Sequence, residues 1–341
     1  MDMSNSQESL EPVMVEKQLL NRIPKNLISR FDPIYVEYYN KYNVDRLATH
    51  QVPIKDFRAN PEKYTVSYGR DRVSAEGLNI SDQICPVKDG EITVRIFKRD
   101  SVTPVKAPRP VYINFHGGGW VFGGLPTDFD FCKRIVQHLD CVVFDVDYRL
   151  APEYPYPIPI RKEKKDEFGL DLSRVAIGGC SAGGHLSAVI AHICRDQNIP
   201  LALQILSVPV VDLHVFTRDG KIRADVPYSS YIEMAETQPL PLERMAYFHK
   251  AFLGCPRPAA LEHEWKVSPI LAPNFEGLAP ALIITAEMDV LRDEGMLYAQ
   301  KLKEAGCQVE IETMEGAPHI FMQLDECKFD STAEDRVVRK G

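Results

Sequence analysis

Short apolar runs alternate with longer segments of helical character from about residue 91 onward. The runs are rich in Val and Ile, which favours strands, and the segments between them are long enough for helices. Alternating strands and helices are typical of a mostly parallel sheet with helices on its faces. Seven strands are predicted, at residues 91–98, 111–115, 141–146, 174–179, 203–208, 281–286 and 308–313.

The middle runs are apolar without alternation. Residues 142–144 read Val-Val-Phe, and residues 281–284 read Ala-Leu-Ile-Ile. A strand with one solvent face alternates apolar and polar residues, so these runs predict strands covered on both faces. We therefore expect an α/β fold with a large central sheet.

Two regions do not follow this rhythm. Residues from about 10 to 75 contain Tyr-rich amphipathic stretches interrupted by prolines, and residues 212–268 form a second mixed segment. We interpret both as helical cap elements, and peripheral packing helices are the alternative. The predicted organisation is an N-terminal cap segment at 1–75 and a catalytic domain at 76–341, with a cap insertion at about 212–268.

Composition narrows the class of protein. The chain has 341 residues, 45% hydrophobic and 26% charged, which is typical of a globular protein. A net charge of -8 argues against a nucleic-acid partner, because binding to phosphates depends on clustered Lys and Arg. Residues 1–17 lack the pattern of a signal peptide, and no apolar stretch reaches membrane-spanning length. We expect a cytoplasmic protein that acts on a small molecule.

The eight cysteines show neither a CxxC pair nor a regular spacing. This distribution is typical of small buried side chains in a reducing compartment, and not of a disulfide framework or a zinc site. No metal is expected.

Gly179-Cys180-Ser181-Ala182-Gly183 follows an apolar strand and matches the G-x-S-x-G pattern of a nucleophile elbow. Such a sharp turn between strand and helix leaves no space for side chains at its two glycines, and it places Ser181 at a helix N-terminus. A glycine-rich turn without chemistry is the competing interpretation of this motif alone.

His116-Gly117-Gly118-Gly119-Trp120 follows the strand at 111–115, upstream of the elbow, where lipases and esterases have their oxyanion loop. Consecutive glycines let the backbone approach a substrate and direct N–H donors at a developing negative charge. The predicted donors are the N–H groups of Gly117, Gly118 and Ala182.

With these motifs, the sequence resembles the hormone-sensitive-lipase-like branch of the α/β hydrolases, which also contains plant carboxylesterase-like proteins. The resemblance spans about residues 80–325 and implies a serine esterase with Asp289 as the acid and His319 as the base. It is carried by residues 116–120 (HGGGW), 147–153 (DYRLAPE), 179–184 (GCSAGG), 287–294 (EMDVLRDE) and 319–321 (HIF).

Physical reasoning agrees with this assignment. Asp289 and His319 each follow a predicted strand, and the carboxyl ends of parallel strands share the edge at which ligands bind. The rival acids Glu287, Asp293 and Glu294 are explained more simply as loop or helix-start charges. Two other histidines are interpreted as structural, with His185 in packing and His116 holding the shape of its loop.

The sequence departs from the family pattern at two places. Cys180 stands where members usually have Asp. The connection at residues 158–172 leaves little room for the usual long crossover helix, although about a dozen residues suffice to close a parallel crossover. We expect a smaller cover on the sheet, and with it a locally exposed apolar face, lower stability or a truncated gene product.

The predicted function is hydrolysis of a small to medium acyl ester through an acyl-enzyme on Ser181, without a metal or organic cofactor. One alternative is a dehydratase-like or cyclase-like reaction that uses the same loop and His319. Another is a ligand-binding receptor on the same scaffold, which the resemblance associates with loss of the catalytic histidine. His319 is present in this chain.

Overall fold

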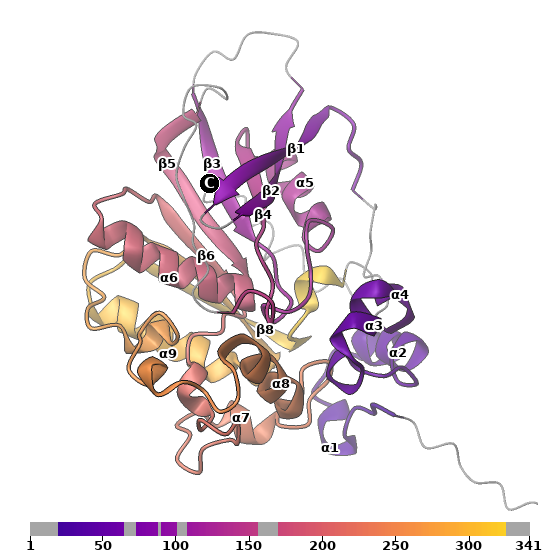
Figure 1. Cartoon of the computed structure of the whole chain (residues 1–341). Coiled ribbons are helices and arrows are strands. Elements are labelled where there is room, and N and C mark those ends of the chain that lie inside the picture. The colour runs from indigo at the N-terminus through magenta and orange to yellow at the C-terminus, as the bar shows by residue number, and fades with distance from the viewer. Residues whose placement is uncertain (1–19, 65–72, 88–89, 101–107, 156–169, 325–341) are drawn as a thin grey trace, which may run out of the picture.

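The computed structural model describes residues 20–64, 73–87, 90–100, 108–155 and 170–324. Its centre is an eight-stranded sheet with the order β1-β2-β4-β3-β5-β6-β7-β8 (Figure 1). Strand β2 pairs antiparallel with β1 and β4, and every other pairing is parallel. The strands are β1 (Leu78–Val87), β2 (Gly90–Arg99), β3 (Arg109–Phe115), β4 (Val142–Asp147), β5 (Leu170–Cys180), β6 (Leu203–Ser207), β7 (Ala281–Met288) and β8 (Val309–Pro318).

The mostly parallel α/β sheet expected from the apolar runs is confirmed, and all seven predicted strands are present. Strand β1 was missed. It lies at the edge of the sheet, none of its residues is fully buried, and polar residues such as Asp82 interrupt it, so it lacks the apolar run of a central strand.

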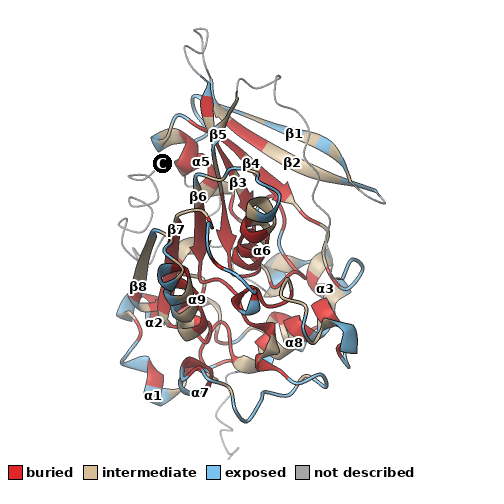
Figure 2. Ribbon diagram, turned by 90° about the vertical axis from the view of Figure 1, so that its left-hand side faces the viewer, coloured by how far each residue is buried: buried red, intermediate tan, exposed pale blue. Residues whose placement is uncertain are grey.

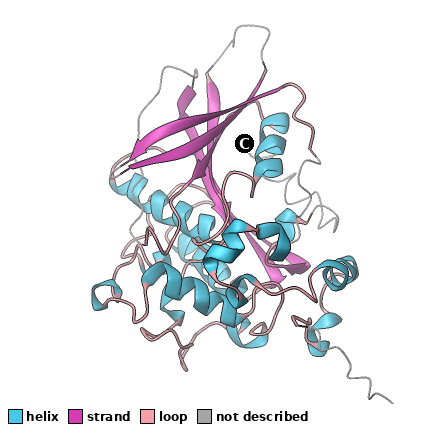
Figure 3. Cartoon of the chain, turned by 45° about the vertical axis from the view of Figure 1, so that its right-hand side comes forward, coloured by secondary structure: helices cyan, strands magenta, loops and turns pink. Residues whose placement is uncertain are grey.

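Helices cover both faces of the sheet in the described part of the chain (Figure 3). Helices α6 (Ala182–Asp196) and α9 (Arg292–Glu304) share one apolar core with β5 to β7, whereas α5 (Phe129–His138) packs with another core on the opposite face. The central strands are accordingly almost continuously buried, and the β1–β2 hairpin is the more exposed part of the sheet (Figure 2). Burial on both faces explains the continuous apolar runs.

The remaining helices gather at one end of the sheet, beyond the carboxyl ends of the parallel strands (Figures 1 and 2). They come from the two regions that interrupted the predicted rhythm. The α-helices are α1 (Lys25–Ile28), α2 (Pro33–Tyr42), α3 (Ile54–Ala59), α4 (Pro61–Tyr64), α7 (Ser230–Glu233) and α8 (Leu242–Leu253). Short 3₁₀ turns are η1 (Thr49–Gln51), η2 (Leu213–Val215), η3 (Ala259–Leu261), η4 (Pro269–Leu271) and η5 (Phe321–Gln323).

The short crossover between β4 and β5 lies partly outside the described residues, which stop at 155 and resume at 170. On the face of the sheet that α6 covers, Ile113 and its register partner Phe144 are only partly buried, although both lie in central strands. The apolar cover is therefore thinner here, and the expected loss of stability stays a prediction.

Seven of the eight cysteines lie in the described residues, and all seven are free thiols. Cys132, Cys141 and Cys180 are buried as expected, but Cys255 is exposed, so the expectation of buried cysteines was wrong for that residue. Cys327 lies outside the described residues. Within the part of the chain that the structure describes, no helix is both long and apolar enough to cross a membrane.

Candidate active site

Ser181 occupies the turn between β5 and α6 in a strained conformation, with φ of 56° and ψ of -114°. A positive φ is unfavourable for a residue with a side chain and persists only where neighbouring contacts hold it. Here the Ser181 N–H donates to the carbonyl of Ser207 at 2.9 Å, and its carbonyl accepts from the N–H of His185 at 3.0 Å. The turn therefore fixes the Ser181 side chain at the end of the sheet.

The two glycines that flank this turn have no space for a side chain. A Cβ at Gly179 would lie 2.2 Å from the carbonyl oxygen of Phe115, and one at Gly183 would lie 1.8 Å from the same oxygen. Strand β3 thus passes directly against the elbow, which explains why the sequence has glycine at both positions.

The structure brings together the three side chains that the motifs predicted. His319 follows β8, and its Nε2 lies 2.9 Å from Ser181 Oγ. Its Nδ1 lies 2.7 Å from Oδ2 of Asp289, which follows β7. A carboxylate can only accept, so Nδ1–H donates to Asp289 and leaves the Nε2 lone pair for the serine hydroxyl. The exposed fractions of Ser181, Asp289 and His319 are 8%, 0% and 6%.

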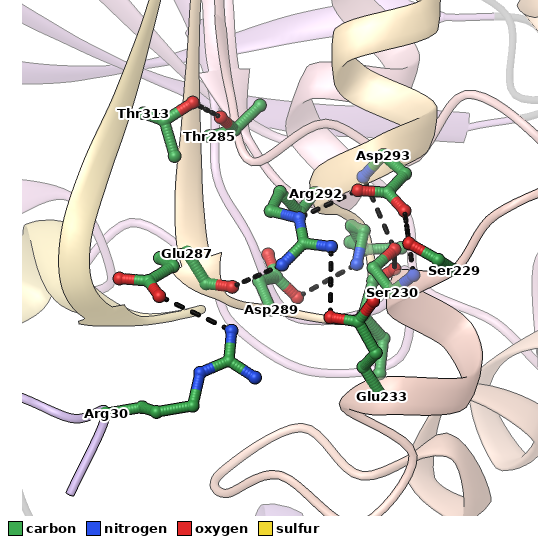
Figure 4. A network of polar contacts seen from close by, with 12 residues as sticks. Arg30, Ser229, Ser230, Glu233, Thr285, Glu287, Asp289, Arg292, Asp293 and Thr313 are labelled. Carbon is green, nitrogen blue, oxygen red and sulfur yellow. Dashed lines mark hydrogen bonds and ion pairs between the residues drawn. The ribbon is translucent and has the colours of Figure 1, made fainter. Parts of the chain in front are cut away.

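The loop that carries Asp289 is held by hydrogen bonds on both sides (Figure 4). The second carboxylate oxygen of Asp289 accepts the N–H of Leu291 at 3.1 Å, and Arg292 donates to the carbonyl of Glu287 at 3.2 Å. From the preceding insertion, the Ser230 hydroxyl donates to the carbonyl of Val290 at 2.7 Å. Residues 212–268 therefore help to fix the carboxylate that contacts the imidazole.

The rival acids bind elsewhere. Glu287 forms an ion pair with Arg30 at 3.4 Å, and Asp293 accepts hydrogen bonds from residues 229 and 230 (Figure 4). Glu294 is buried and accepts the N–H groups of residues 211 and 212. Of these four acids, which all lie in the described part of the chain, Asp289 is the one that contacts His319.

Residues 116–124, here called the glycine loop, follow β3 and lie next to the elbow. Its backbone needs glycine at several positions, because Gly118, Gly119 and Gly123 have φ of 122°, 60° and 95°. A Cβ at Gly118 would lie 2.1 Å from the carbonyl oxygen of Phe122, and one at Gly119 would lie 2.4 Å from the ring of Phe248 in α8. The loop is therefore tightly folded on itself, and α8 from residues 212–268 covers it.

Among the N–H groups of the elbow and the glycine loop, those of Gly117, Gly118 and Ala182 have no acceptor within the described residues. Ala182 is the first residue of α6, where backbone N–H groups have no partner inside the helix and favour negative charge. These are the donors that the sequence predicted for an oxyanion.

His116 contacts its own loop, which agrees with the expectation that it holds the shape of this loop. Its Nδ1 donates to the carbonyl of Gly117 at 2.7 Å, and its ring stacks on Tyr148 at a centroid distance of 4.1 Å. The Tyr148 hydroxyl donates to the carbonyl of His116 at 2.8 Å. Burial lowers the pKa of His116 to about 4, so the ring is neutral at neutral pH.

His185 does more than pack. It accepts the indole N–H of Trp120 at 3.3 Å, and its Nε2 donates to the carbonyls of Lys266 and Val267 at 3.1 and 3.2 Å. It thereby joins the glycine loop to the insertion. Burial lowers the pKa of His185 to about 4. The sequence missed this link because a histidine one turn beyond Ser181 has no pattern that distinguishes linking from packing.

Cys180 lies next to Gly117 and lines a small cavity of about 40 Å³ on the α5 side of the sheet. Asn114 and Asp128 also line this cavity, and the Asn114 amide donates to Asp128 at 3.2 Å and to Asp145 at 2.8 Å. Burial raises the pKa of both carboxyls and of the Cys180 thiol. The thiol therefore stays protonated and unreactive at neutral pH.

A comparison with protein-family models matches residues 112–323 to a family described as alpha/beta hydrolase fold. An AB hydrolase superfamily protein of Schizosaccharomyces pombe is 34% identical over 87% of this chain and 88% of its own length. Esterase LipI of Mycobacterium tuberculosis is 34% identical over 72% of this chain and 75% of its own length.

Solved structures agree with these relatives. The hyperthermophilic esterase of the archaeon Pyrobaculum calidifontis superimposes with a TM-score of 0.77 at 28% identity, covering 91% of this chain and 97% of that chain. A thermostable esterase from Pseudomonas putida gives a TM-score of 0.76 at 28% identity, covering 92% and 96%. The family match takes in both the glycine loop and the elbow, and the chain belongs to the α/β-hydrolase fold family, in its hormone-sensitive-lipase-like carboxylesterase branch.

Proposed function

We propose that this protein hydrolyses small to medium carboxylic esters, with Ser181 as nucleophile, His319 as base and Asp289 as the acid that orients it. The observation that carries the proposal is the chain of contacts from Ser181 Oγ to His319 Nε2 at 2.9 Å and from His319 Nδ1 to Asp289 at 2.7 Å. Free N–H donors lie beside it. Esterases among the relatives and solved structures support the same reaction.

In the acylation step, Ser181 Oγ attacks the ester carbonyl while His319 Nε2 takes the hydroxyl proton. The carbonyl π electrons move to oxygen and give a tetrahedral oxyanion. Asp289 keeps the imidazole in the reactive tautomer and stabilises its cationic form, which is favourable because this carboxylate is fully buried. His319 then protonates the leaving alcohol as the C–O bond breaks.

The three free N–H groups of Gly117, Gly118 and Ala182 receive the oxyanion. They are fixed before the reaction by the turns that carry them, so little reorganisation is needed as charge develops. In the deacylation step water replaces the alcohol, His319 removes its proton, and the acid leaves with regeneration of the Ser181 hydroxyl. Ser181, His319 and Asp289, together with these N–H groups, provide each step of acylation and deacylation.

We further propose that the helices at 20–64 and those within 212–268 form a cap that encloses the ester. The support is their position at the carboxyl ends of the strands and the contact of Phe248 with the glycine loop at Gly119. Aromatic side chains gather there, with Phe57 and Phe122 at 4.4 Å and Phe122 and Phe248 at 5.9 Å between centroids. Such a surface suits an apolar acyl or alcohol group of limited size.

Labelling with a serine-directed phosphonate tests the reaction. We expect one equivalent of label on Ser181, loss of p-nitrophenyl acetate hydrolysis in proportion, and neither label nor activity in Ser181→Ala. The matched control is Ser268→Ala, which removes another buried hydroxyl that contacts a histidine, at 2.7 Å from His214 Nδ1. This variant should keep both label and activity.

If Ser181→Ala keeps its activity, the proposal of acyl transfer to serine is wrong, and an elimination or cyclisation that needs only His319 and the glycine loop becomes the better explanation.

A series of p-nitrophenyl esters from acetate to laurate measures the size of the enclosed site. We expect kcat/KM to peak at a short or medium chain, and a maximum at the longest ester would contradict the proposed cap.

A further inference from the structure

Arg58 lies outside every motif found in the sequence, on α3 in the N-terminal segment. Its guanidinium group nevertheless reaches the glycine loop. Nε and Nη2 donate to the carbonyl of Val121 at 3.2 and 2.8 Å, and Nη2 also donates to the carbonyl of Ala151 at 2.7 Å. Nη1 donates to both carboxylate oxygens of Glu153, at 3.0 and 2.9 Å.

The glycine loop needs support of this kind because it holds a non-glycine residue, Trp120, in a strained backbone conformation. Gly118, Gly119 and Trp120 have φ of 122°, 60° and 61° in succession, and Trp120 carries a large side chain in this region. Inside the loop, the carbonyl of Gly118 accepts the N–H groups of Val121 and Phe122 at 3.2 and 2.9 Å. The strain at Trp120 persists only where contacts from outside the loop hold its far side in place.

Two outside contacts meet on that far side. The carbonyl of Trp120 accepts the N–H of Ala151 at 2.8 Å, and the next carbonyl, of Val121, accepts the two Arg58 donors. Because Arg58 also binds the carbonyl of Ala151, it joins the two loop segments that contain Val121 and Ala151. The planar guanidinium provides donors in a fixed fork, which the single ammonium of lysine does not.

We propose that Arg58 is a positioning residue for ester hydrolysis, which fixes the glycine loop at Val121 so that the N–H groups of Gly117 and Gly118 face the oxyanion. The proposal rests on the proposed function. It gives one residue of the N-terminal segment a part in positioning the glycine loop, in addition to the place of this segment in the proposed cap. Arg58 itself contacts no reacting atom and acts through the main chain of the loop.

The experiment compares Arg58→Ala and Arg58→Lys with Arg46→Ala in the full chain. Arg46 is the matched control because its guanidinium binds the carbonyl of Lys63 within the N-terminal segment, at 3.4 Å. Loss of one oxyanion donor costs on the order of 10²–10³ in turnover. Because Arg58 acts one step away, we expect Arg58→Ala to lower kcat by about tenfold or more with KM nearly unchanged, and Arg58→Lys to recover little.

A trifluoromethyl ketone, whose adduct with serine carries an oxyanion, gives an independent measurement. Its affinity for Arg58→Ala should fall by the same factor as kcat, and added guanidinium chloride at millimolar concentration should restore part of both. Arg46→Ala should retain wild-type kcat and inhibitor affinity, and the melting temperatures of all variants show whether any loss follows unfolding.

The inference is overturned if Arg58→Ala keeps wild-type kcat, if KM alone rises, or if kcat falls only as much as in an Arg46→Ala variant of equal melting temperature. These results would leave ester hydrolysis itself intact. Failure of the proposed function is recognised separately, by Ser181→Ala retaining hydrolysis while Arg58 is unchanged.

Discussion

At the scale of single residues, the site depends on groups whose charge state is set by burial. His116, His185 and His249 are all buried and their pKa values are lowered mainly by desolvation. These three rings are neutral at neutral pH. What distinguishes His319 as the proposed base is geometry, because its Nε2 lies 2.9 Å from Ser181 Oγ.

His249 provides a test of this electrostatic argument. Neither of its ring nitrogens has a hydrogen-bond partner within the described residues, and burial, aided by Arg257, lowers its pKa to about 3. The unfolded chain, with a pKa near 6.5, binds more protons between pH 3 and 6.5, so the folded state loses stability as pH falls through this window. His249→Phe lacks this loss.

We expect the stability of His249→Phe relative to wild type to increase by about 2 kcal/mol between pH 7 and pH 5. The new ring would keep the edge contacts with Phe216 and Trp120, which lie at 4.6 and 6.1 Å between centroids. Melting curves of the two proteins across pH measure the difference. A difference independent of pH would show that His249 is not held neutral.

At the scale of elements, helix α2 links the N-terminal segment to the rest of the molecule. The Asp32 side chain caps the helix by accepting the N–H groups of Ile34 and Tyr35 at 2.7 and 3.3 Å. The Tyr35 hydroxyl then donates to the carbonyl of Gln238 in the insertion at 2.9 Å. The N-cap of helix α2 therefore stabilises a contact between the two regions that we propose to cover the site.

Asp32→Ala should lower the free energy of unfolding by about 1 kcal/mol, the usual cost of losing an N-cap side chain. Asp32→Ser keeps a capping oxygen and should lose much less. The N–H of Asp32, which donates to the carbonyl of Gly316 at 3.0 Å, is present in both variants. Urea midpoints compare them, and equal losses in the two variants would mean that the carboxylate acts other than as a cap.

The elements also show which parts of the fold and of the site the sequence alone could predict. Short β-rich runs predicted seven strands, and in the middle of the sheet burial on both faces makes these runs continuously apolar, whereas the half-exposed edge strand β1 has no such run. Motifs predicted Ser181, Asp289 and His319, which the structure places in contact. Arg58 could not be found, because hydrogen bonds to main-chain carbonyls require no particular residue in the partner and so leave no pattern to read.

At the scale of the whole molecule, the face of the sheet that α6 covers is unevenly buried. Ile113 is only partly buried on the face that α6 covers, whereas Ile283, a central residue of β7 in the same apolar core, is 0% exposed. Deleting one methyl group costs about 0.5–1.5 kcal/mol where packing is complete and less where solvent reaches the side chain.

Ile283→Val should therefore lower the melting temperature more than Ile113→Val, although the chemical change is the same. Differential scanning calorimetry of the two variants measures this directly. If both substitutions cost the same, the sheet is evenly packed and the short connection between β4 and β5 carries no penalty.

The distance along the chain between the interacting groups has a consequence for biogenesis. Ser181 and His319 are 138 residues apart, and Arg58 binds a carbonyl 63 residues away. A nascent or refolding chain in which His319 has not yet reached Ser181 lacks the proposed base, so it is unable to turn over an ester by this mechanism. The time at which activity appears during translation or refolding therefore reports when the segments that carry Ser181 and His319 have packed together.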